Sequence, residues 1–273
     1  MQGAGNDFVF VNCFAEPVEN PQALARFVND RHFGIGGDGL VLIEPSETAD
    51  FRMRMFNPDG SEAMCGNALR CFGKFLYARG LTDSTLIAAE TIDGNRTLEL
   101  KLSKVGEVEQ VTVDMGEPEL RPVHIPVNST ADRYIDQPIS IDGDQYQITC
   151  VSMGNPHAVV FAHGIDDLDL TYLGPKFEHH PLFPDRVNTE FIELTSDPHK
   201  IKMRVWERGA GETLACGTGS CAAAVAGVLT GMTPRDVTIK LRGGDLHIRW
   251  DEQNNHVYMT GGAEFVFDGE LAD

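Results

Sequence analysis

The sequence predicts a mixed α/β protein of two related domains, each with strands arranged around one buried helix. A length of 273 residues suits about two domains. A Cys-Gly pair followed by a helix-forming run occurs twice, at Cys65 and at Cys216, 151 positions apart. A repeat of that length indicates two copies of one domain rather than an array of short units.

The composition limits the classes of protein to which the chain can belong. Hydrophobic residues make up 42% of the chain, which is enough for real cores. The net charge of −19 and the pI of about 4.7 describe a surface that repels nucleic acid and anionic membranes. Because the acidic residues are scattered, we interpret the charge as a source of solubility. No apolar run is long enough to span a bilayer, no signal peptide is visible, and six cysteines without a secretory signal argue against a disulfide scaffold, so we expect a cytoplasmic protein.

In the first half, Asn20 and Pro21 are an N-cap and a first-turn proline, and they predict a helix that continues to about Arg31. A glycine-rich loop at 31–39 then follows a helix and precedes a strand. That order is wrong for a dinucleotide-binding fingerprint, so we interpret the segment as a tight loop that lines a pocket. Alternating or continuous apolar patterns predict strands at 8–12, 40–43, 51–56, 97–102 and 109–115.

The second half repeats this order after a linker at 116–118 with prolines behind it. We expect a helix near 167–173. Strands are expected at 145–151, 158–161, 189–194, 201–206, 237–241, 246–250, 257–259 and 264–267. The predicted domains are therefore an N-terminal one at 1–116, completed by 264–273, and a C-terminal one at 117–263.

Each Cys-Gly pair lies where a polar loop meets a helix. The run 222–229 has no charged residue and predicts a buried helix, and in the first copy one helical face is apolar: Ala68, Leu69, Phe72, Phe75 and Leu76. Helix N-termini have N–H groups without intrahelical partners, which attract anions. Thr218 and Ser220 are candidate caps, and the helix dipole favours the thiolate of a cysteine at this position. The two motifs offer reactive sulfurs and carboxylate cradles, and the two helices are expected to face each other across a cleft.

The remaining cysteines fit a simpler interpretation, since a buried cysteine is usually an inert small hydrophobe. We assign this role to the four cysteines outside the Cys-Gly pairs: Cys13, Cys71, Cys150 and Cys221. A structural zinc site would need Cys-x-x-Cys or Cys/His spacing, which neither motif has, so no metal is expected. A structural disulfide between the two motif cysteines is disfavoured in the cytoplasm, although air oxidation would form it if the sulfurs approach.

Six pieces of the chain stand out in order: Gly5-Asn6-Asp7-Phe8, the loop 31–39, Asn57-Pro58-Asp59-Gly60-Ser61 with Cys65-Gly66-Asn67, Gly154-Asn155-Pro156-His157, Arg186-Val187-Asn188-Thr189-Glu190, and 207–219. Together they resemble the diaminopimelate epimerase family along nearly the whole chain. The resemblance implies two pseudo-symmetric domains, each a curved, mostly antiparallel sheet around a central helix, with the active site in the cleft between them. It also implies a homodimer that interconverts LL- and meso-diaminopimelate for lysine and peptidoglycan-precursor biosynthesis, without a cofactor.

Inversion of an α-carbon needs a base on one face and an acid on the other, and the resemblance assigns these roles to Cys65 and Cys216 as thiolate and thiol. Backbone N–H groups at the two helix starts would bind the substrate carboxylate. They belong to Gly66, Asn67, Gly217 and Thr218. The resemblance further implies side chains that bind the amino and carboxylate groups: Asn6, Asn57, Asn155, Asn188, Glu207 and Arg208. Arg208 suits the distal carboxylate because its fork can pair bidentately, and His157 and Glu207 would assist proton placement on the thiols.

Two departures from the family pattern lie in the first motif, where Ala68 replaces a usual glycine and the span from Gly60 to Cys65 is one residue short. They bear on the loop path and substrate choice. The rival enzymes are a related cysteine-pair racemase with another substrate, such as histidine, and a proline racemase. The phenazine-biosynthesis isomerases lack the cysteine pair and fit poorly. A non-catalytic binding protein is the alternative of another class.

Overall fold

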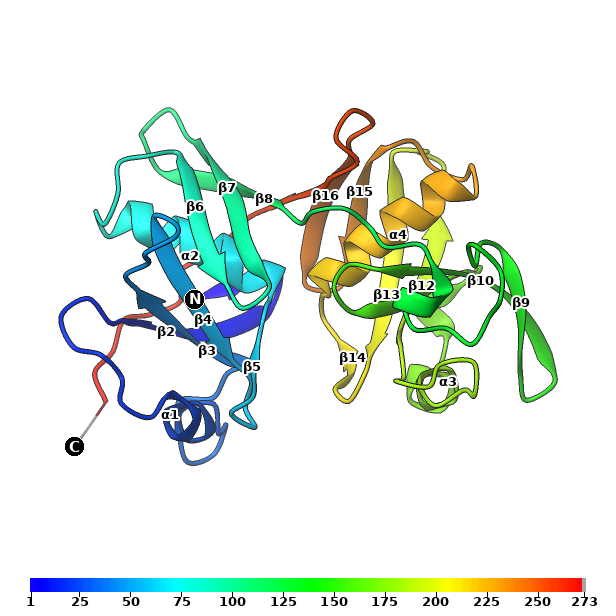
Figure 1. Ribbon diagram of the computed structural model, residues 1–273, viewed down its shortest axis with the longest axis horizontal. Coiled ribbons are helices and arrows are strands. Elements are labelled where there is room, and N and C mark those ends of the chain that lie inside the picture. The colour runs from blue at the N-terminus through cyan, green and yellow to red at the C-terminus, as the bar shows by residue number, and fades with distance from the viewer. Residues whose placement is uncertain (272–273) are drawn as a thin grey trace. The chain divides into compact units, whose positions relative to one another are not determined.

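The computed structural model describes residues 1–271, which divide into two compact units. The first unit comprises Met1–Asp114 and the segment that begins at Thr260, and the second comprises Met115–Met259. In Figure 1, the red C-terminal segment accordingly belongs with the blue and cyan elements. Among the described residues no helix is both long and apolar enough to cross a membrane.

The first unit is a sheet with two α-helices among its described residues. Its strands are β1 (Gln2–Gly3), β2 (Asn6–Asn12), β3 (Gly39–Glu44), β4 (Phe51–Phe56), β5 (Glu62–Ala63), β6 (Leu86–Thr91), β7 (Gly94–Leu102) and β8 (Val108–Asp114). Its helices are α1 (Pro21–Val28) and α2 (Gly66–Ala78). The pairs β2–β3 and β4–β6 are parallel, and β1–β2, β3–β4, β4–β5, β6–β7 and β7–β8 are antiparallel.

The second unit repeats this plan. Its strands are β9 (Gln137–Ile141), β10 (Asp144–Ser152), β11 (Pro156–Phe161), β12 (Asn188–Leu194), β13 (Lys200–Glu207), β14 (Gly211–Thr213), β15 (Asp236–Leu241), β16 (Gly244–Trp250) and β17 (Val257–Gly261), the last of which runs on past Met259. Its α-helices are α3 (Leu170–Glu178) and α4 (Gly217–Leu229), with 3-10 turns η1 (Pro122–His124) and η2 (Ile165–Asp167). The parallel pairs are β11–β12 and β13–β15.

The predicted repeat is confirmed at the level of topology. The order β2, α1, β3, β4, β5, α2, β6, β7 is matched by β11, α3, β12, β13, β14, α4, β15, β16, with parallel pairs at the same two places. The fold class is therefore the predicted one: mixed α/β, mostly antiparallel, with one central helix in each unit.

The central helices form for different reasons. Helix α2 is amphipathic and packs its buried face, which includes Leu69, Phe72 and Leu76, on β7 and β8. Helix α4 is apolar almost all round and lies among β10, β12 and β16, as its uncharged sequence predicted. The peripheral helices begin at side-chain N-caps, since Asn20 accepts from Ala23 N, and Asp169 accepts from the N–H groups of α3.

Three predicted elements differ from the structure. Helix α1 ends at Val28 rather than near Arg31. The predicted strand at 264–267 is wrong, because that segment makes only an isolated bridge between Glu264 and Gln2. The helix expected near 167–173 begins later, at Leu170, where Asp169 caps it. Strands β6 and β9 were not predicted from the sequence. Both contain weak strand formers, which are alanines in β6 and Pro138 in β9.

Candidate functional site

The two motif cysteines occupy the same position in their units. Cys65 is the N-cap residue of α2, with φ −140° and ψ 119°, and Cys216 is the N-cap residue of α4, with φ −126° and ψ 116°. Both are extended residues at the end of the short arm, β5 or β14, that precedes the helix. The predicted loop-to-helix junction is therefore confirmed for each cysteine.

The sulfur of Cys216 is held by the first turn of its own helix. Its Sγ accepts a hydrogen bond from Gly219 N at 3.3 Å and lies 3.5 Å from the Thr218 hydroxyl. The Ser220 hydroxyl donates to the Cys216 carbonyl at 2.8 Å rather than capping the sulfur side of the turn. A Cβ at position 219 would lie 2.5 Å from Glu190 Oε1 and 3.2 Å from Cys216 Sγ, so this approach requires glycine.

The surroundings of Cys216 act against the thiolate that the helix dipole is expected to favour. Burial raises the pKa of Cys216 well above its ordinary value, and the carboxylates of Glu207 and Glu190 raise it further. The hydrogen bonds from Thr218 and Gly219 only partly offset these effects. Desolvation and the two neighbouring carboxylates thus favour the protonated form of Cys216 and outweigh the hydrogen bonds from the first turn of the helix.

Glu207 lies at the end of β13 beside this thiol. Its carboxylate accepts a hydrogen bond from the Thr213 hydroxyl and interacts with the Cys216 thiol. Burial raises the pKa of Glu207, which the Thr213 hydrogen bond opposes. A carboxyl group of raised pKa in hydrogen-bond contact with a thiol is suited to exchange a proton with it.

His157 and Asn155 are linked by a buried chain of polar contacts. His157 and Glu190 are both fully buried, with His157 Nδ1 2.7 Å from Glu190 Oε1. His157 Nε2 lies 2.9 Å from Asn155 Oδ1. With Oδ1 engaged by the imidazole, the amide N–H groups of Asn155 are the part of that side chain that remains for an anionic ligand.

Asn188 and Arg208 are joined through the backbone. Arg208 N donates to Asn188 Oδ1 at 2.9 Å, and Asn188 Nδ2 donates to the Pro156 carbonyl at 2.8 Å. The Arg208 guanidinium itself donates to the Asp185 carbonyl at 2.9 Å. Asn188 thus anchors the turn that carries Arg208.

The first unit builds an equivalent chain around α2. Asn67 Nδ2 donates to Asn6 Oδ1 at 2.8 Å, and Asn6 Nδ2 donates to Asp38 Oδ2 at 2.7 Å. An arginine donates to the residue at each end of this chain. Arg70 donates to Asn67 Oδ1 at 2.7 Å, and Arg31 donates to Asp38 Oδ1 at 3.0 Å. Asn6 is thereby fixed beside the first turn of α2, in which Gly66 and Asn67 are the first helical residues.

Asn57 lies in the turn between β4 and β5. Its backbone N donates to the Ser61 carbonyl at 2.8 Å, and its Nδ2 donates to the Ser61 hydroxyl at 3.0 Å. Gly60, with φ +87°, lets the chain double back, and Arg26 of α1 holds the turn through the Asp59 carbonyl at 2.9 Å. The turn is the counterpart of the one that carries Arg208.

Within each unit the structure brings most of the predicted residues together. Asn6, Gly66 and Asn67 lie at the start of α2 with Cys65, and Asn57 lies in the preceding turn. In the second unit a hydrogen-bonded set surrounds the start of α4: Cys216, Thr218, Glu207, His157 and Asn155. Sequence reasoning missed the parts played by Asp38, Thr213 and Glu190. All three stood inside recognised motifs, Asp38 in 31–39, Glu190 in 186–190 and Thr213 in 207–219, which was the available signal.

Similar solved structures show the fold. The fold matches a phenazine biosynthesis protein of the PhzF family from Bacillus anthracis, with a TM-score of 0.71, 18% identity, and coverage of 100% of this chain and 95% of that one. It also matches a hydroxyproline epimerase from Agrobacterium vitis, with a TM-score of 0.66, 15% identity and coverage of 96% and 86%. The chain thus has a two-unit α/β fold that epimerases and phenazine-biosynthesis proteins use.

Sequence comparison then identifies the family. A family model described as diaminopimelate epimerase matches residues 1–121 and 149–266. Diaminopimelate epimerases of Acetivibrio thermocellus and Desulfovibrio desulfuricans are 59% and 60% identical, each over 99% of this chain and 96% of the relative. That of Methanococcus maripaludis is 54% identical over 99% of this chain and 98% of its own length. The chain belongs to the diaminopimelate epimerase family.

Proposed function

We propose that the protein is a diaminopimelate epimerase that moves a proton between the two faces of the substrate α-carbon, with Cys65 and Cys216 as the two acid/base groups. The observation that carries the proposal is the duplicated placement of one cysteine as N-cap of the central helix in each unit. Two such groups on opposite faces of a carbon are what inversion requires.

The reaction balances with these two sulfurs alone. The Cys65 thiolate removes the α-proton and becomes a thiol, and the electron pair left on carbon takes the proton of the Cys216 thiol from the other face. Cys216 suits the acid role because its burial and its two carboxylate neighbours keep the proton on sulfur. In the reverse direction the roles exchange. No cofactor or metal takes part in this scheme.

The surrounding groups have complementary tasks. The first-turn N–H groups of α2 and α4, at Gly66, Asn67, Gly217 and Thr218, stabilise the negative charge that develops as the α-proton leaves. Side chains that hold the substrate's amino and carboxylate groups are Asn6, Asn57, Asn155 and Asn188. Glu207 and His157 return protons to Cys216, and Arg208 pairs with the distal carboxylate.

We further propose the setting of this activity. The protein works in the cytoplasm as a homodimer, in lysine and peptidoglycan-precursor biosynthesis, on a small-molecule substrate. The family membership and the 51–60% identity of its relatives support this setting.

The test is α-proton exchange and epimerisation of LL-diaminopimelate in deuterated water, followed by NMR. Cys65→Ala and Cys216→Ala are expected to lower turnover by orders of magnitude while the protein stays folded. Cys221→Ala is the matched control, because Cys221 is a buried cysteine of α4 one turn further on. Near-normal turnover in either first variant contradicts the two-thiol mechanism. A wild type that prefers another amino acid, histidine included, contradicts the substrate assignment alone.

A further inference from the structure

Each unit contains the same arginine–glutamate bridge just ahead of its cysteine. In the first unit Arg54 Nε and Nη2 donate to the two oxygens of Glu62 at 2.9 and 2.8 Å. In the second, Arg204 Nε and Nη2 donate to the two oxygens of Glu212 at 2.8 and 3.1 Å. Both arginines and both glutamates are 150 positions apart in the sequence. The bridge is thus part of the duplicated plan.

The two bridges have the same geometry across a hairpin. Glu62 of β5 lies opposite Phe56 of β4, and Glu212 of β14 lies opposite Trp206 of β13. In both cases the arginine stands two residues before that partner, so it reaches its glutamate diagonally on one face of the hairpin. The returning arm, β5 or β14, is the segment that delivers the cysteine to its helix.

These arms are short. Strand β5 has two residues and β14 has three. Cys65 follows Glu62 by three positions, and Cys216 follows Glu212 by four. A strand pairing of two or three residues constrains the position of the arm only weakly by itself. A bidentate guanidinium–carboxylate pair adds two charge-assisted hydrogen bonds of fixed direction, so it sets where the arm ends.

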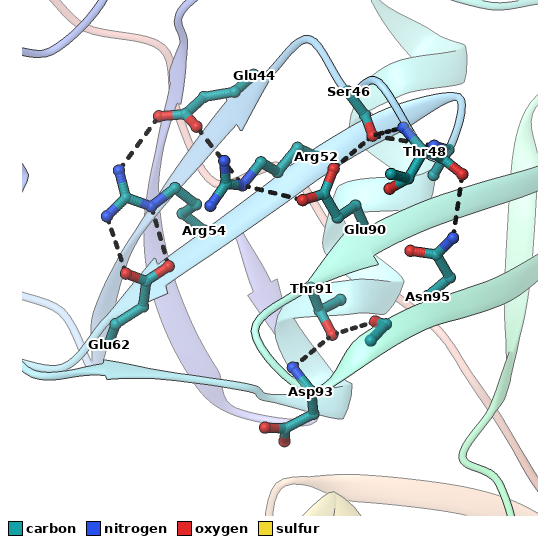
Figure 2. A network of polar contacts seen from close by, with 12 residues as sticks. Glu44, Ser46, Thr48, Arg52, Arg54, Glu62, Glu90, Thr91, Asp93 and Asn95 are labelled. Carbon is teal, nitrogen blue, oxygen red and sulfur yellow. Dashed lines mark hydrogen bonds and ion pairs between the residues drawn. The ribbon is translucent and has the colours of Figure 1, made fainter.

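Both bridges are anchored to other parts of their units. Figure 2 shows Arg54 between Glu62 and Glu44 of β3, with Arg52 joining Glu44 to Glu90 of β6. In the second unit the Arg204 side chain is only 6% exposed. It also donates to the carbonyls of Ile165 and Leu168 at 2.5 and 2.8 Å. The same anchoring is therefore achieved by different neighbours in the two units.

We propose that Arg54–Glu62 and Arg204–Glu212 are positioning pairs, each of which sets the place of the sulfur that its arm delivers, Cys65 or Cys216. None of these four residues is assigned contact with substrate. Their effect on turnover rests on the proposed two-thiol function, whereas their effect on each sulfur does not.

The test measures each sulfur separately. Iodoacetamide labels the folded protein at pH 8.5, and peptide mass spectrometry gives the labelling rates of Cys65 and Cys216. We expect Glu62→Gln to change the Cys65 rate by about fivefold or more and to leave the Cys216 rate unchanged, and Glu212→Gln to do the reverse. Epimerase kcat is expected to fall about 10-fold or more in both, with a smaller change in KM, because displaced sulfurs still leave the binding side chains in place.

Two further variants separate geometry from charge and from a general loss of stability. Arg54→Lys keeps the charge but loses the fork, so it is expected to behave like Glu62→Gln, and the double variant to be no worse than either alone. Arg121→Gln is the matched control. It removes another bidentate pair, to Glu119 at 2.9 and 2.6 Å, that leads to no cysteine. It should change neither labelling rate nor kcat.

The outcomes are distinct. If Glu62→Gln or Glu212→Gln changes both labelling rates together with the melting temperature, the bridges are only structural and the inference fails. If both rates stay at the wild-type values, it fails as well. If the labelling changes are as expected but the wild type epimerises no substrate, the positioning of the sulfurs stands and the proposed function falls.

Discussion

Cys216 combines a position that ordinarily activates a thiol with surroundings that hold its proton. After burial itself, the Glu207 carboxylate contributes most to the raised pKa of Cys216. Replacing that carboxylate by a neutral amide of the same shape removes a negative charge and leaves the burial unchanged. The local electrostatics therefore determine how much of the sulfur is thiolate at a given pH.

We expect Glu207→Gln to lower the pKa of Cys216, so that labelling of this thiol by iodoacetamide begins at lower pH than in the wild type. The measurement is the labelling rate of the Cys216 peptide against pH by mass spectrometry. Glu193→Gln is the control, because Glu193 is a carboxylate of β12 that pairs with Lys202 rather than with the thiol. A pH profile that does not move contradicts the assigned electrostatics.

The buried thiol of Cys71 makes the stability of the protein depend on pH in the alkaline range. Burial raises its pKa from 9.0 to about 12. The folded state keeps the thiol proton to higher pH than the unfolded chain does. The stability that Cys71 supports is therefore complete below pH 9 and is lost as pH rises toward 12. The free energy of unfolding falls by up to about 1.4 kcal/mol per pH unit in this range.

Cys71→Ala is therefore expected to flatten the fall of unfolding free energy between pH 9 and 11. At pH 7 the same variant should be less stable than the wild type by about 1–2 kcal/mol, because it leaves a small cavity. Urea unfolding at both ends of this range checks the difference. Curves that stay parallel would show that the thiol does not ionise on unfolding.

At the scale of elements, helix α3 is fitted to the hairpin that carries Arg208. A Cβ at Gly174 would lie 2.1 Å from the Trp206 ring. The Trp206 indole donates to Glu178 at 2.8 Å, and Glu178 accepts from Gly209 N at 2.9 Å. Helix, tryptophan and turn are thus connected by contacts that leave no room for a methyl group.

We expect Gly174→Ala to cost about 1–3 kcal/mol of stability by overpacking, and to raise KM more than it lowers kcat because the Arg208 turn moves. Thermal unfolding and steady-state kinetics test both effects. Gly262→Ala is the control, since its added Cβ meets nothing closer than a carbonyl oxygen at 4.0 Å, and it should stay within about 0.5 kcal/mol of the wild type. Equal losses in the two variants would contradict the assigned fit.

The elements that sequence analysis found are those with a local signal. Helix α4 has an uncharged apolar sequence, and α1 has an N-cap followed by proline, so both were predictable. Strand β9 contains Pro138, which argues against a strand unless the strand lies at an edge, and β6 begins at an exposed leucine. Val266 and Phe267, which suggested a strand, are 62% and 64% exposed.

For the whole molecule, the duplication was visible because both copies keep a Cys-Gly pair, and it predicted the shared topology. The buried chain from Glu190 through His157 to Asn155 was not predictable, because it joins residues 33 positions apart through the pairing of β11 with β12. The Arg–Glu bridges were detectable in principle, since their spacing repeats, yet isolated charges on a strand are usually solvated. The proton state of Cys216 depends on burial, which one sequence does not give.

The C-terminal segment closes the first unit. Gln2 and Glu264 exchange two backbone hydrogen bonds of 2.8 Å. Arg70 Nε donates to the Gly262 carbonyl at 3.2 Å, and Lys74 pairs with Glu264 at 3.1 Å. The guanidinium of Arg79 lies over the Phe265 ring, 4.7 Å from its centre. These contacts fasten β1 and helix α2, so the first unit depends on residues from the far end of the chain.

A chain that ends at Gly261 is therefore expected to keep the second unit and to loosen the first. Hydrogen exchange should quicken at the amides of α2, by about 10-fold or more, and stay slow at those of α4. Lys74→Gln, which breaks only a half-exposed ion pair, is the control and should change neither helix measurably. Equal acceleration in both helices would contradict the separate closure of the first unit.

This closure has a consequence for synthesis on the ribosome. The second unit occupies one uninterrupted stretch, Met115–Met259, so it can fold as soon as that stretch has emerged. The first unit begins to be translated earlier, but it lacks its closing segment until the residues after the second unit have been made. Domains usually fold in the order in which they are made. Here the unit whose synthesis begins first is the one completed last, because its closing segment follows the second unit in the sequence.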